Sequence, residues 1–431
     1  MTEKHVKINV PVLARVEGEG ALEIDIENKE ITRVNLKIYE PPRFFEKFLE
    51  GRHYSEVPDI VARICGICPV AYQMTAVHAF ENLFQTEPGK WIHDMRRLFY
   101  CGEWIESHAL HIHLLAAPDF LGYDNVTAMA KDYPDEVRRG IQLQNAGNKI
   151  LKFLGGRSVH PIGVKVGGFY HSPDLETAET LLTELNDITP LADELIQWLS
   201  SLALPNHSQD ITYVALVNDS NYPFNFGNIK SNNGLNITAS NYAEHFTEFH
   251  APHSTALHST LNDEPYLVGP LARLNLNNHL LNDNLQNDIK QSQLNLPDTN
   301  MFNSIIARAV EIKYALNEAV TLLEHYSEPE KPFVDVSPKA GIAYAATEAP
   351  RGLLWHEYHV DENGTVLSSR IVPPTSQNQA RIEADLKISL TEFGLDQAED
   401  KIRFYAEQII RNYDPCISCA THFLDLRIKK L

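Results

Sequence analysis

The sequence predicts a mainly helical protein of the α+β class, with a large helical bundle as its core, a β-sheet region at the N-terminus and a second β-hairpin. The first forty residues alternate between apolar and polar side chains, as strands with one buried face do. Farther on, Leu98, Ile105 and Ile112 recur every seven residues, as the buried face of a long helix requires. Asn363-Gly364 lies between two β-rich runs and is a strong hairpin turn signal.

In chain order, the segments ALEIDIEN and ITRVNLKI predict two strands joined by a turn near Asn28. The run LLWHEYHVDENGTVLSSRIV predicts the later hairpin, and the asparagine-rich stretch Leu271–Asn300 predicts a peripheral helix and loop without chemistry. Neither an internal repeat nor a domain linker is evident, so residues 1–431 are expected to form one domain. Periodicity predicts helices at about 91–115, 134–154, 175–202 with a break at Pro190, 300–326 and 394–413.

Composition excludes some classes of function. The formal net charge of −20 repels nucleic-acid phosphates and anionic lipid, so neither nucleic acid nor a membrane surface is expected as a partner. No apolar run approaches the roughly 18 residues that span a bilayer. The charged start, MTEKHVKINV, lacks the apolar segment of a secretion signal, which predicts a cytoplasmic protein.

Four of the five cysteines form two C-x-x-C pairs, Cys65 with Cys68 and Cys416 with Cys419. Asp414-Pro415 is a plausible helix N-cap and first-turn proline, so both pairs are expected at helix N-termini, where thiolates are favoured. Zinc sites place such pairs roughly 15–20 residues apart, whereas here the whole fold separates them. From the cysteines alone, structural zinc, a catalytic metal and thiol chemistry remain open.

The flanking residues carry a family resemblance. RICGICP and DPCISCATH together resemble the paired signature of the catalytic large subunit of nickel-iron hydrogenases. Further segments match that family in the same order, and the resemblance extends over nearly the whole chain. These segments are RVEGEG (Arg15–Gly20), PRFFEKFLEGR (Pro42–Arg52), GGRSVHP with VGGF (Gly155–Phe169), EAPRG (Glu348–Gly352) and PPTSQN (Pro373–Asn378).

The resemblance implies that all four thiolates hold nickel. Cys68 and Cys419 would also bridge to an iron that carries carbon monoxide and two cyanides. Arg351 and Thr375 match family positions that contact the cyanides, and a guanidinium and a hydroxyl are suitable donors. Taken alone, Arg351 also fits a buried ion pair and Thr375 a turn.

The resemblance also assigns proton transfer and a structural cation. H2 is cleaved heterolytically, and the expected base is the Cys416 thiolate, with Glu17 as the next proton carrier. Without the family match, Glu17 fits a surface turn. Glu46 and His422 match ligands of a structural magnesium ion, although His422 also fits an ordinary helix histidine.

The tail after His422 has two interpretations. In the family, a maturation protease removes this segment once nickel is loaded, so residues 423–431 are expected to be cleaved off. The other interpretation is a short basic amphipathic segment that packs on the surface.

Partner subunits are expected, because only Cys101 remains outside the two pairs and an iron-sulfur cluster needs more ligands. No nucleotide-binding motif is present either. The resemblance implies a small subunit with iron-sulfur clusters and a diaphorase module with flavin and NAD(P). Glu19 and Tyr72 stand where many members have histidine, which favours the NAD(P)-linked branch that includes sulfhydrogenases.

The predicted function is therefore reversible H2 oxidation coupled to NAD(P), with sulfur or polysulfide reduction as an added activity. Three nearby histidines, His108, His111 and His113, are interpreted as core or interface residues rather than a proton path. The alternatives are a hydrogen-sensing regulatory subunit or a non-catalytic metal-binding one. The tail argues against the sensor, and the four cysteines argue against the non-catalytic role.

Overall fold

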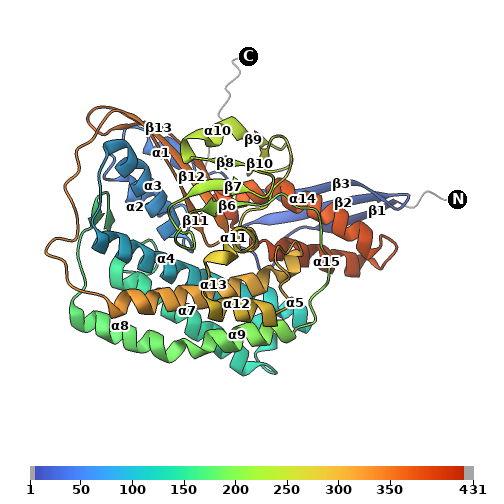
Figure 1. Cartoon of the computed structure of the whole chain (residues 1–431). Coiled ribbons are helices and arrows are strands. Elements are labelled where there is room, and N and C mark those ends of the chain that lie inside the picture. The colour runs from blue at the N-terminus through green and yellow to red at the C-terminus, as the bar shows by residue number, and fades with distance from the viewer. Residues whose placement is uncertain (1–4, 422–431) are drawn as a thin grey trace, which may run out of the picture.

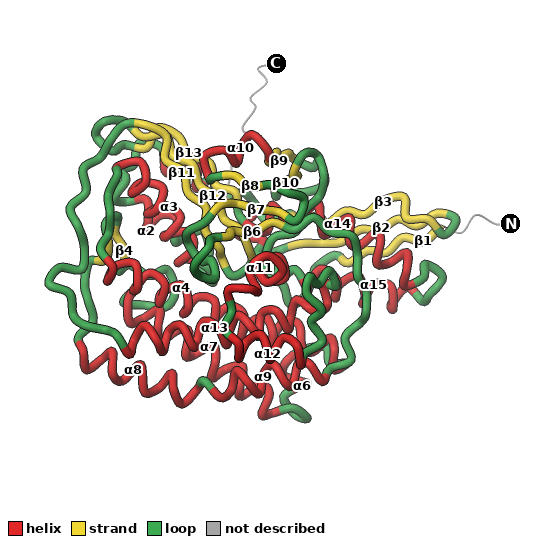
Figure 2. The backbone as a smooth tube through the Cα atoms, viewed as in Figure 1, coloured by secondary structure: helices red, strands yellow, loops and turns green. Residues whose placement is uncertain are grey.

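The computed structural model describes residues 5–421. Long helices gather in one half of the molecule, and small antiparallel sheets occupy the other half and the N-terminal end (Figure 1). The separation of helices from strands is evident along the backbone (Figure 2). A continuous apolar core includes residues from Ile8 near the start to Ala420 near the end. The predicted α+β class with a helical core is confirmed.

The helices predicted from periodicity are present as α4, α7, α8, α9, α13 and α15, with bounds that agree to within a few residues, whereas several others were not predicted. The first eight helices of the chain are α1 (Phe45–Leu49), α2 (Val57–Val61), α3 (Pro69–Phe84), α4 (Lys90–Leu110), α5 (Ala117–Leu121), α6 (Val126–Met129), α7 (Pro134–Gly155) and α8 (Leu175–Ile188). The others are α9 (Pro190–Ser201), α10 (Tyr242–His245), α11 (Pro270–Asn277), α12 (Asp283–Gln291), α13 (Ser304–Glu324), α14 (Pro374–Phe393), α15 (Glu399–Asn412) and α16 (Ile417–Ala420).

The helical core is built around α4, which packs against α7 and α13. Its contact with α7 is close because two glycines face each other there. A Cβ on Gly147 would lie 2.5 Å from the Gly102 carbonyl oxygen, so side chains are excluded at this crossing. After α4 the chain continues through a π-helical turn, His111–Ala116, into α5. Such turns interrupt the regular helical pattern and re-aim the side chains they carry.

The N-terminal sheet has the order β1-β2-β3, with β1 (His5–Val10), β2 (Gly20–Glu27) and β3 (Glu30–Ile38). The predicted turn joins β2 to β3 at Asn28 and Lys29, which both have positive φ, as a tight two-residue hairpin requires. Strand β1 was not predicted.

The later hairpin is also confirmed. Strands β12 (Gly352–Val360) and β13 (Val366–Val372) are joined through Gly364, whose φ is +82°. Strand β11 (Gly341–Ala349) pairs with β12 and completes a three-stranded sheet. This strand escaped prediction because five successive residues at its end are buried, so the alternation that marks a surface strand is missing.

Other small sheets were not predicted from the sequence. They comprise β4 (Val164–Lys165) with β5 (Gly168–Phe169), β6 (Val214–Val217) with β7 (Asn228–Ser231) and β8 (Asn236–Ile237), and β9 (Phe246–His250) with β10 (Leu257–Leu261).

The expectation for Leu271–Asn300 is wrong in its first part. Helix α11 lies in the core rather than at the periphery, and its Arg273 is fully buried. The asparagines that suggested a peripheral segment lie mostly after this helix.

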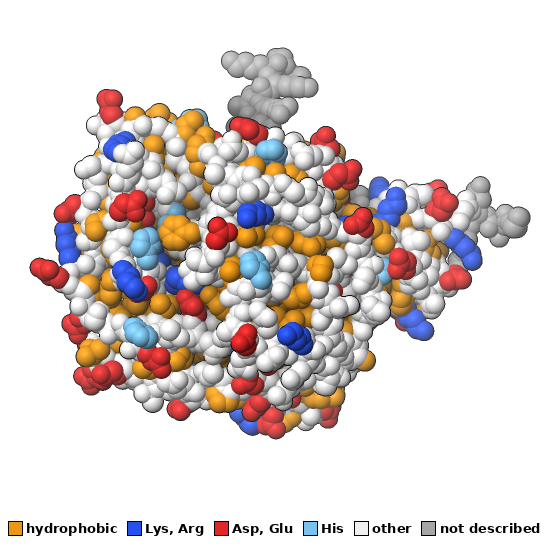
Figure 3. Space-filling model, in the orientation of Figure 1, with side chains coloured by type: hydrophobic (Ala, Val, Ile, Leu, Met, Phe, Trp, Pro, Cys, Tyr) orange, Lys and Arg blue, Asp and Glu red, His pale blue; other side chains and the backbone are white. Residues whose placement is uncertain are grey.

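On the visible face of the molecule, Lys and Arg side chains are interspersed with Asp and Glu (Figure 3). This mixed surface fits the acidic net charge and gives polyanions no broad basic area on that face. Among residues 5–421, no helix combines the length and the apolar character needed to cross a bilayer.

Candidate metal centre

The four cysteines come from two short segments that the fold brings together. Cys65 lies in the loop before α3, and Cys68 is the residue that precedes the first turn of that helix. Cys416 precedes α16 in the same way, and Cys419 lies within that helix. The expectation of Asp414 as the N-cap is wrong, because Asp414 has a φ of +50° and its carboxylate turns toward Arg351 instead.

The four sulfur atoms form one buried cluster, and all lie within 4.8 Å of one another. The Cys65 and Cys416 sulfurs are 3.4 Å apart, and those of Cys68 and Cys419 are 3.5 Å apart. Each sulfur of the first segment therefore lies close to one of the second, and a shorter separation, 2.7 Å, joins Cys416 and Cys419 within the second segment. Four soft donors at this spacing fit a thiolate-bound transition metal.

The protonation of the cluster is strongly perturbed. Contacts from Cys416, Cys419 and Cys68 lower the pKa of Cys65 well below its usual value, whereas burial raises the pKa of Cys416. Without a cation, the cluster therefore shares its protons unequally. A metal ion that displaces these protons would remove this unequal protonation, because its positive charge stabilises all four thiolates together.

Two side chains that the sequence analysis did not single out hold the cysteine segments in place. Arg43 donates hydrogen bonds to the carbonyl oxygens of Ile64 and Ser418, so one guanidinium joins both segments. Buried Glu103 accepts hydrogen bonds from the backbone N–H groups of Val70 and Ala71 and caps the start of α3. Both contacts join residues distant in sequence, so spacing alone gave no signal.

Arg351 lies buried beside the cluster. Its Nε donates to the Asp414 carbonyl oxygen at 2.8 Å, and its Nη2 to the Asp414 carboxylate at 3.1 Å. Although burial disfavours the charged form, Asp414 and the nearby cysteines raise the pKa of Arg351 well above its usual value. The guanidinium therefore stays charged and leaves Nη1 with only a long, 3.4 Å contact to Ser107.

Thr375 lies at the start of α14, and its Oγ1 accepts a hydrogen bond from the Cys416 backbone N–H at 3.0 Å. The hydroxyl proton is then free to point toward another acceptor. Arg351 and Thr375 therefore reach the same cysteine segment from two different elements. The ion-pair interpretation of Arg351 describes its contact with Asp414, whereas the turn interpretation of Thr375 is wrong, because Thr375 lies in a helix.

The EAPRG motif is held by Arg273. Its guanidinium makes two hydrogen bonds to Glu311, at 2.8 and 2.7 Å, and one to Glu348 at 2.9 Å. It also donates to the carbonyl oxygens of Ala349 and Pro350, the two residues before Arg351. Arg273 thus fixes the backbone that aims Arg351, a role that the sequence analysis missed.

Glu17 lies beside the second cysteine pair. Its carboxylate accepts a hydrogen bond from the Ser418 N–H at 3.0 Å, and its backbone carbonyl accepts one from the Ile417 N–H at 3.1 Å. The RVEGEG segment therefore runs alongside the cysteine segment. A glutamate in an ordinary surface turn would not need these two hydrogen bonds to the cysteine segment.

Glu46 lies on α1, where its carboxylate accepts a hydrogen bond from the Ile371 N–H of β13 at 2.8 Å. The structure thus places Glu46 at the end of the sheet that leads into PPTSQN. The other expected cation ligand, His422, and the tail 423–431 lie outside the described residues.

The three histidines of the α4 region are core residues, as expected. His108, His111 and His113 are all buried. Burial lowers the pKa of His108 to about 4 and the pKa of His111 to about 3, so both are neutral at physiological pH. Tyr72 is buried as well, and burial raises its pKa well above the usual value, so its phenol does not exchange protons there.

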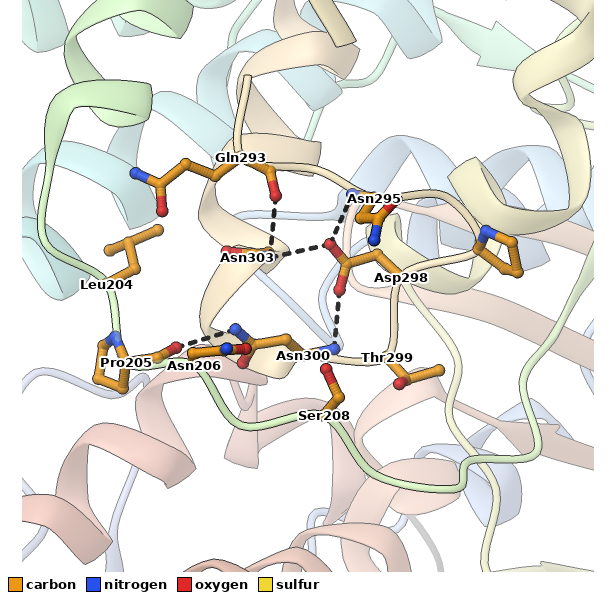
Figure 4. A pocket seen from close by; sticks show the side chains of 11 residues that line it. Leu204, Pro205, Asn206, Ser208, Gln293, Asn295, Asp298, Thr299, Asn300 and Asn303 are labelled. Atoms are coloured by element: carbon orange, nitrogen blue, oxygen red, sulfur yellow. Dashed lines mark hydrogen bonds between the residues drawn. The ribbon is translucent and has the colours of Figure 1, made fainter. Parts of the chain in front are cut away.

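A separate polar pocket of about 400 Å³ shares no lining residue with the cysteine cluster. Asp298 accepts hydrogen bonds from the Asn303 side chain and the Asn300 backbone, each at 2.8 Å (Figure 4). Asn300 in turn donates to the Pro205 carbonyl oxygen at 2.9 Å. These groups satisfy one another, so the pocket's polarity stabilises the loop and points to no ligand.

Comparisons with known proteins agree with the site. The family model for nickel-dependent hydrogenases matches residues 43–139 and 217–422, which include both cysteine pairs. The sulfhydrogenase 1 α subunit of Pyrococcus furiosus is 33% identical over 99% of this chain and 100% of its own length. One subunit of the F420-non-reducing hydrogenase of Methanothermobacter thermautotrophicus is 31% identical over 98% of this chain and 96% of its own length.

The fold agrees with solved structures. An NAD+-reducing [NiFe]-hydrogenase in the H2-reduced state superposes with a TM-score of 0.88 at 24% identity, covering 97% of this chain and 99% of that one. The [NiFeSe]-hydrogenase of Dm. baculatum gives a TM-score of 0.77 at 20% identity, covering 97% and 100%. Because family model, full-length relatives and fold all agree, the chain belongs to the nickel-dependent hydrogenases, as the large catalytic subunit.

Proposed function

We propose that this protein catalyses reversible H2 oxidation at a nickel-iron site held by Cys65, Cys68, Cys416 and Cys419. The observation that supports this most directly is the buried cluster of four sulfurs within 4.8 Å of one another. Elemental analysis of the protein from its native host tests it: near-equal nickel and iron in this chain supports the proposal. Zinc alone at the cluster would contradict it and leave a structural site.

The residues around the cluster suit the diatomic ligands of iron. Cys68 and Cys419, the second member of each pair, would bridge the two metals. The buried Arg351 guanidinium and the Thr375 hydroxyl are donors for two cyanides, and carbon monoxide needs no donor. When bound, the metal pair would accept the electrons of H2 and make its protons acidic.

This chain would then move the proton. We assign the Cys416 thiolate as the base and Glu17 as the next carrier, because Glu17 is bonded to the segment between Cys416 and Cys419. Glu17 is half-buried, so it connects the cluster side of this segment with the protein surface. A carboxylate in such a position exchanges protons readily with water.

Glu17→Gln tests the relay. It keeps an oxygen that can accept from the Ser418 N–H but cannot carry a proton, so H2 oxidation is expected to fall by about 10²-fold or more with nickel and iron unchanged. The measurements are H2-uptake rate, proton-deuterium exchange and metal content. Glu19→Gln, two residues away and exposed, is the matched control and is expected to stay near wild type. Full exchange in Glu17→Gln would refute the assignment.

We further propose that Glu46 and His422 hold a structural magnesium ion and that a protease removes residues 423–431 after nickel loading. His422→Ala is then expected to accumulate as the full-length chain with almost no activity, which intact-mass measurement and H2-uptake assays detect. Asp425→Asn, inside the tail, is the control and should mature normally. A mature-length, active His422→Ala protein would contradict both assignments.

Electrons must leave to another chain, and the surface beside the first cysteine pair suits a partner. His160 Nδ1 donates a hydrogen bond to the Ala62 carbonyl oxygen at 2.7 Å, which places the segment 156–162 against the loop that carries Cys65. Val159 and Ile162 are 53% and 50% exposed there. We propose that a small subunit with iron-sulfur clusters docks on this apolar surface.

Beyond that subunit, the proposed electron path ends at a diaphorase module with flavin and NAD(P), in the cytoplasm. The structural likeness to an NAD+-reducing hydrogenase supports this coupling. The names of the sulfhydrogenase α subunits add sulfur or polysulfide reduction as a second candidate activity. An assay of the purified complex with NAD+, NADP+ and polysulfide as separate acceptors distinguishes these functions.

A further inference from the structure

We propose that His253, His258 and Glu383 form a second metal site, suited to a divalent first-row transition ion such as Zn²⁺. They come from three parts of the fold: the loop between β9 and β10, strand β10 and helix α14. Their ligand atoms all lie within 4.8 Å of one another. The proposal involves none of the four cysteines and does not depend on the proposed function.

The spacing suits a small cation. His253 Nε2 lies 2.8 Å from Glu383 Oε1, and His258 Nε2 lies 3.5 Å from Glu383 Oε2. Zinc bonds of about 2.0–2.2 Å place neighbouring ligands of a tetrahedral ion roughly 3.3–3.5 Å apart. Two imidazoles and one carboxylate also form a ligand set that proteins use for such ions. Small side-chain rotations would therefore complete the site.

His258 provides an independent indication. It is only 2% exposed, yet neither ring nitrogen has a well-formed hydrogen bond in the described structure. Buried polar side chains nearly always have such a bond. A cation bound between His258 and Glu383 would use the lone pair of one ring nitrogen and so explain why this imidazole is buried.

The surrounding backbone holds the ligands in place. Glu383 Oε1 accepts a hydrogen bond from the Leu36 N–H of β3 at 2.8 Å. Between the two histidines, Thr255 Oγ1 donates to the carbonyl oxygens of Ile38 and Glu40, at 3.0 and 2.8 Å. Such outer contacts orient metal ligands and are a usual part of a metal site. These hydrogen bonds attach the histidine loop and the Glu383 carboxylate to β3 and to the residues that directly follow it.

Glu383 lies between the two imidazoles and directs one carboxylate oxygen toward each of them. A charged carboxylate between two imidazoles attracts a divalent ion. The competing interpretation is a histidine-glutamate ion-pair network that holds only protons, and the two interpretations differ in metal content.

The site would connect three elements near the hydrogenase centre. Helix α14 packs against both β10 and β3 (Figure 1). It carries Thr375 in its first turn and Glu383 eight residues later, about 12 Å along the axis. An ion held by Glu383 and the two histidines would fix this helix to the N-terminal sheet and thereby position Thr375.

The experiment measures zinc bound by the purified complex after chelator treatment and equilibration with ZnCl2. Wild type is expected to bind one zinc ion per chain. Glu383→Gln and His253→Ala are each expected to bind this ion at least about tenfold more weakly and so to lose it. Nickel and iron are counted in the same samples. Glu392→Gln is the matched control. Glu392 also lies on α14 and pairs with a histidine, His207, at 2.7 Å, but it forms no cluster with a second histidine among residues 5–421.

The outcomes separate the proposals. Loss of zinc in Glu383→Gln and His253→Ala but not in Glu392→Gln supports the second site. Wild type that binds no zinc sensitive to these changes overturns it, whatever the nickel content. If Glu383→Gln fails to fold, His253→Ala decides, since His253 is partly exposed. Nickel absent from wild type would instead count against the proposed function.

Discussion

Cys416→Ser is expected to lose H2 oxidation by more than about 10³-fold and to contain little nickel. A serine hydroxyl is a harder donor that stays protonated at neutral pH, so the variant lacks both a metal ligand and the proposed base. The substitution also removes the sulfur that lies 3.4 Å from Cys65 in the assembled cluster. H2 uptake and nickel content of the purified complex are the measurements.

Cys101→Ser is the matched control for this prediction. Cys101 is buried on α4 and lies outside the four-sulfur cluster. A serine hydroxyl there can bond to the preceding helical turn, so the variant should keep nickel and activity. If Cys416→Ser instead kept nickel and turned over at the Cys101→Ser rate, the thiolate assignment would be wrong.

Arg273→Met is expected to destabilise the protein by about 3–5 kcal/mol, because it leaves buried Glu311 and Glu348 without their cation. Thermal unfolding and chemical denaturation of the purified protein measure this loss. Activity should fall as well, since Arg273 holds the carbonyl oxygens of Ala349 and Pro350 beside Arg351. Arg273 acts on Arg351 only through the backbone of Ala349 and Pro350. A second substitution that restores stability should therefore restore part of the activity.

Two controls test that reasoning. Arg33→Met removes an ion pair at the surface, between the exposed Arg33 and the partly buried Asp25, and is expected to cost at most about 1 kcal/mol. The double variant Arg273→Met with Glu311→Gln should recover part of the stability, because the glutamine carries no uncompensated charge. A double variant as unstable as the sum of both single changes would refute the charge-pairing explanation.

Acid should weaken the same network. Burial opposes ionisation of Glu311, but Arg273 and His108 lower its pKa to about 2. Since this folded value lies below the ordinary value of about 4.5, the stabilisation is fully present above pH 4.5 and is lost as the pH falls toward 2. Arg273→Met should show a smaller loss across that window than wild type.

Periodic apolar residues made α4 and α13 predictable from sequence, even though long parts of both helices are buried on all sides, whereas some helices with buried polar residues were missed. Helix α14 illustrates the limit, because Thr375, Gln377 and Gln379 are polar yet buried. An amphipathic pattern cannot mark a helix whose polar residues face the interior. The same reasoning explains why Arg273 on α11 was assigned to a peripheral segment.

At the site, the family resemblance singled out the four cysteines, Arg351, Thr375 and Glu17, and the fold gathers these residues near the second cysteine segment. Their supports could not be predicted. Arg43 and Glu103 act on backbone groups far away in sequence, and such contacts leave no local pattern. His253 and His258 likewise meet Glu383 only through the tertiary fold.

The separation of Cys65 and Cys416 by 351 positions has a consequence for biosynthesis. A ribosome releases Cys65 and Cys68 long before Cys416 and Cys419, so a growing chain presents half of the thiols while α4, α7 and α13 are still being made. Two cysteines alone form a weak, unselective ligand pair that zinc or copper can occupy. We therefore expect the metal to be loaded after translation, when Arg43 can join both cysteine segments. A metal bound earlier, by the first pair alone, would yield inactive protein.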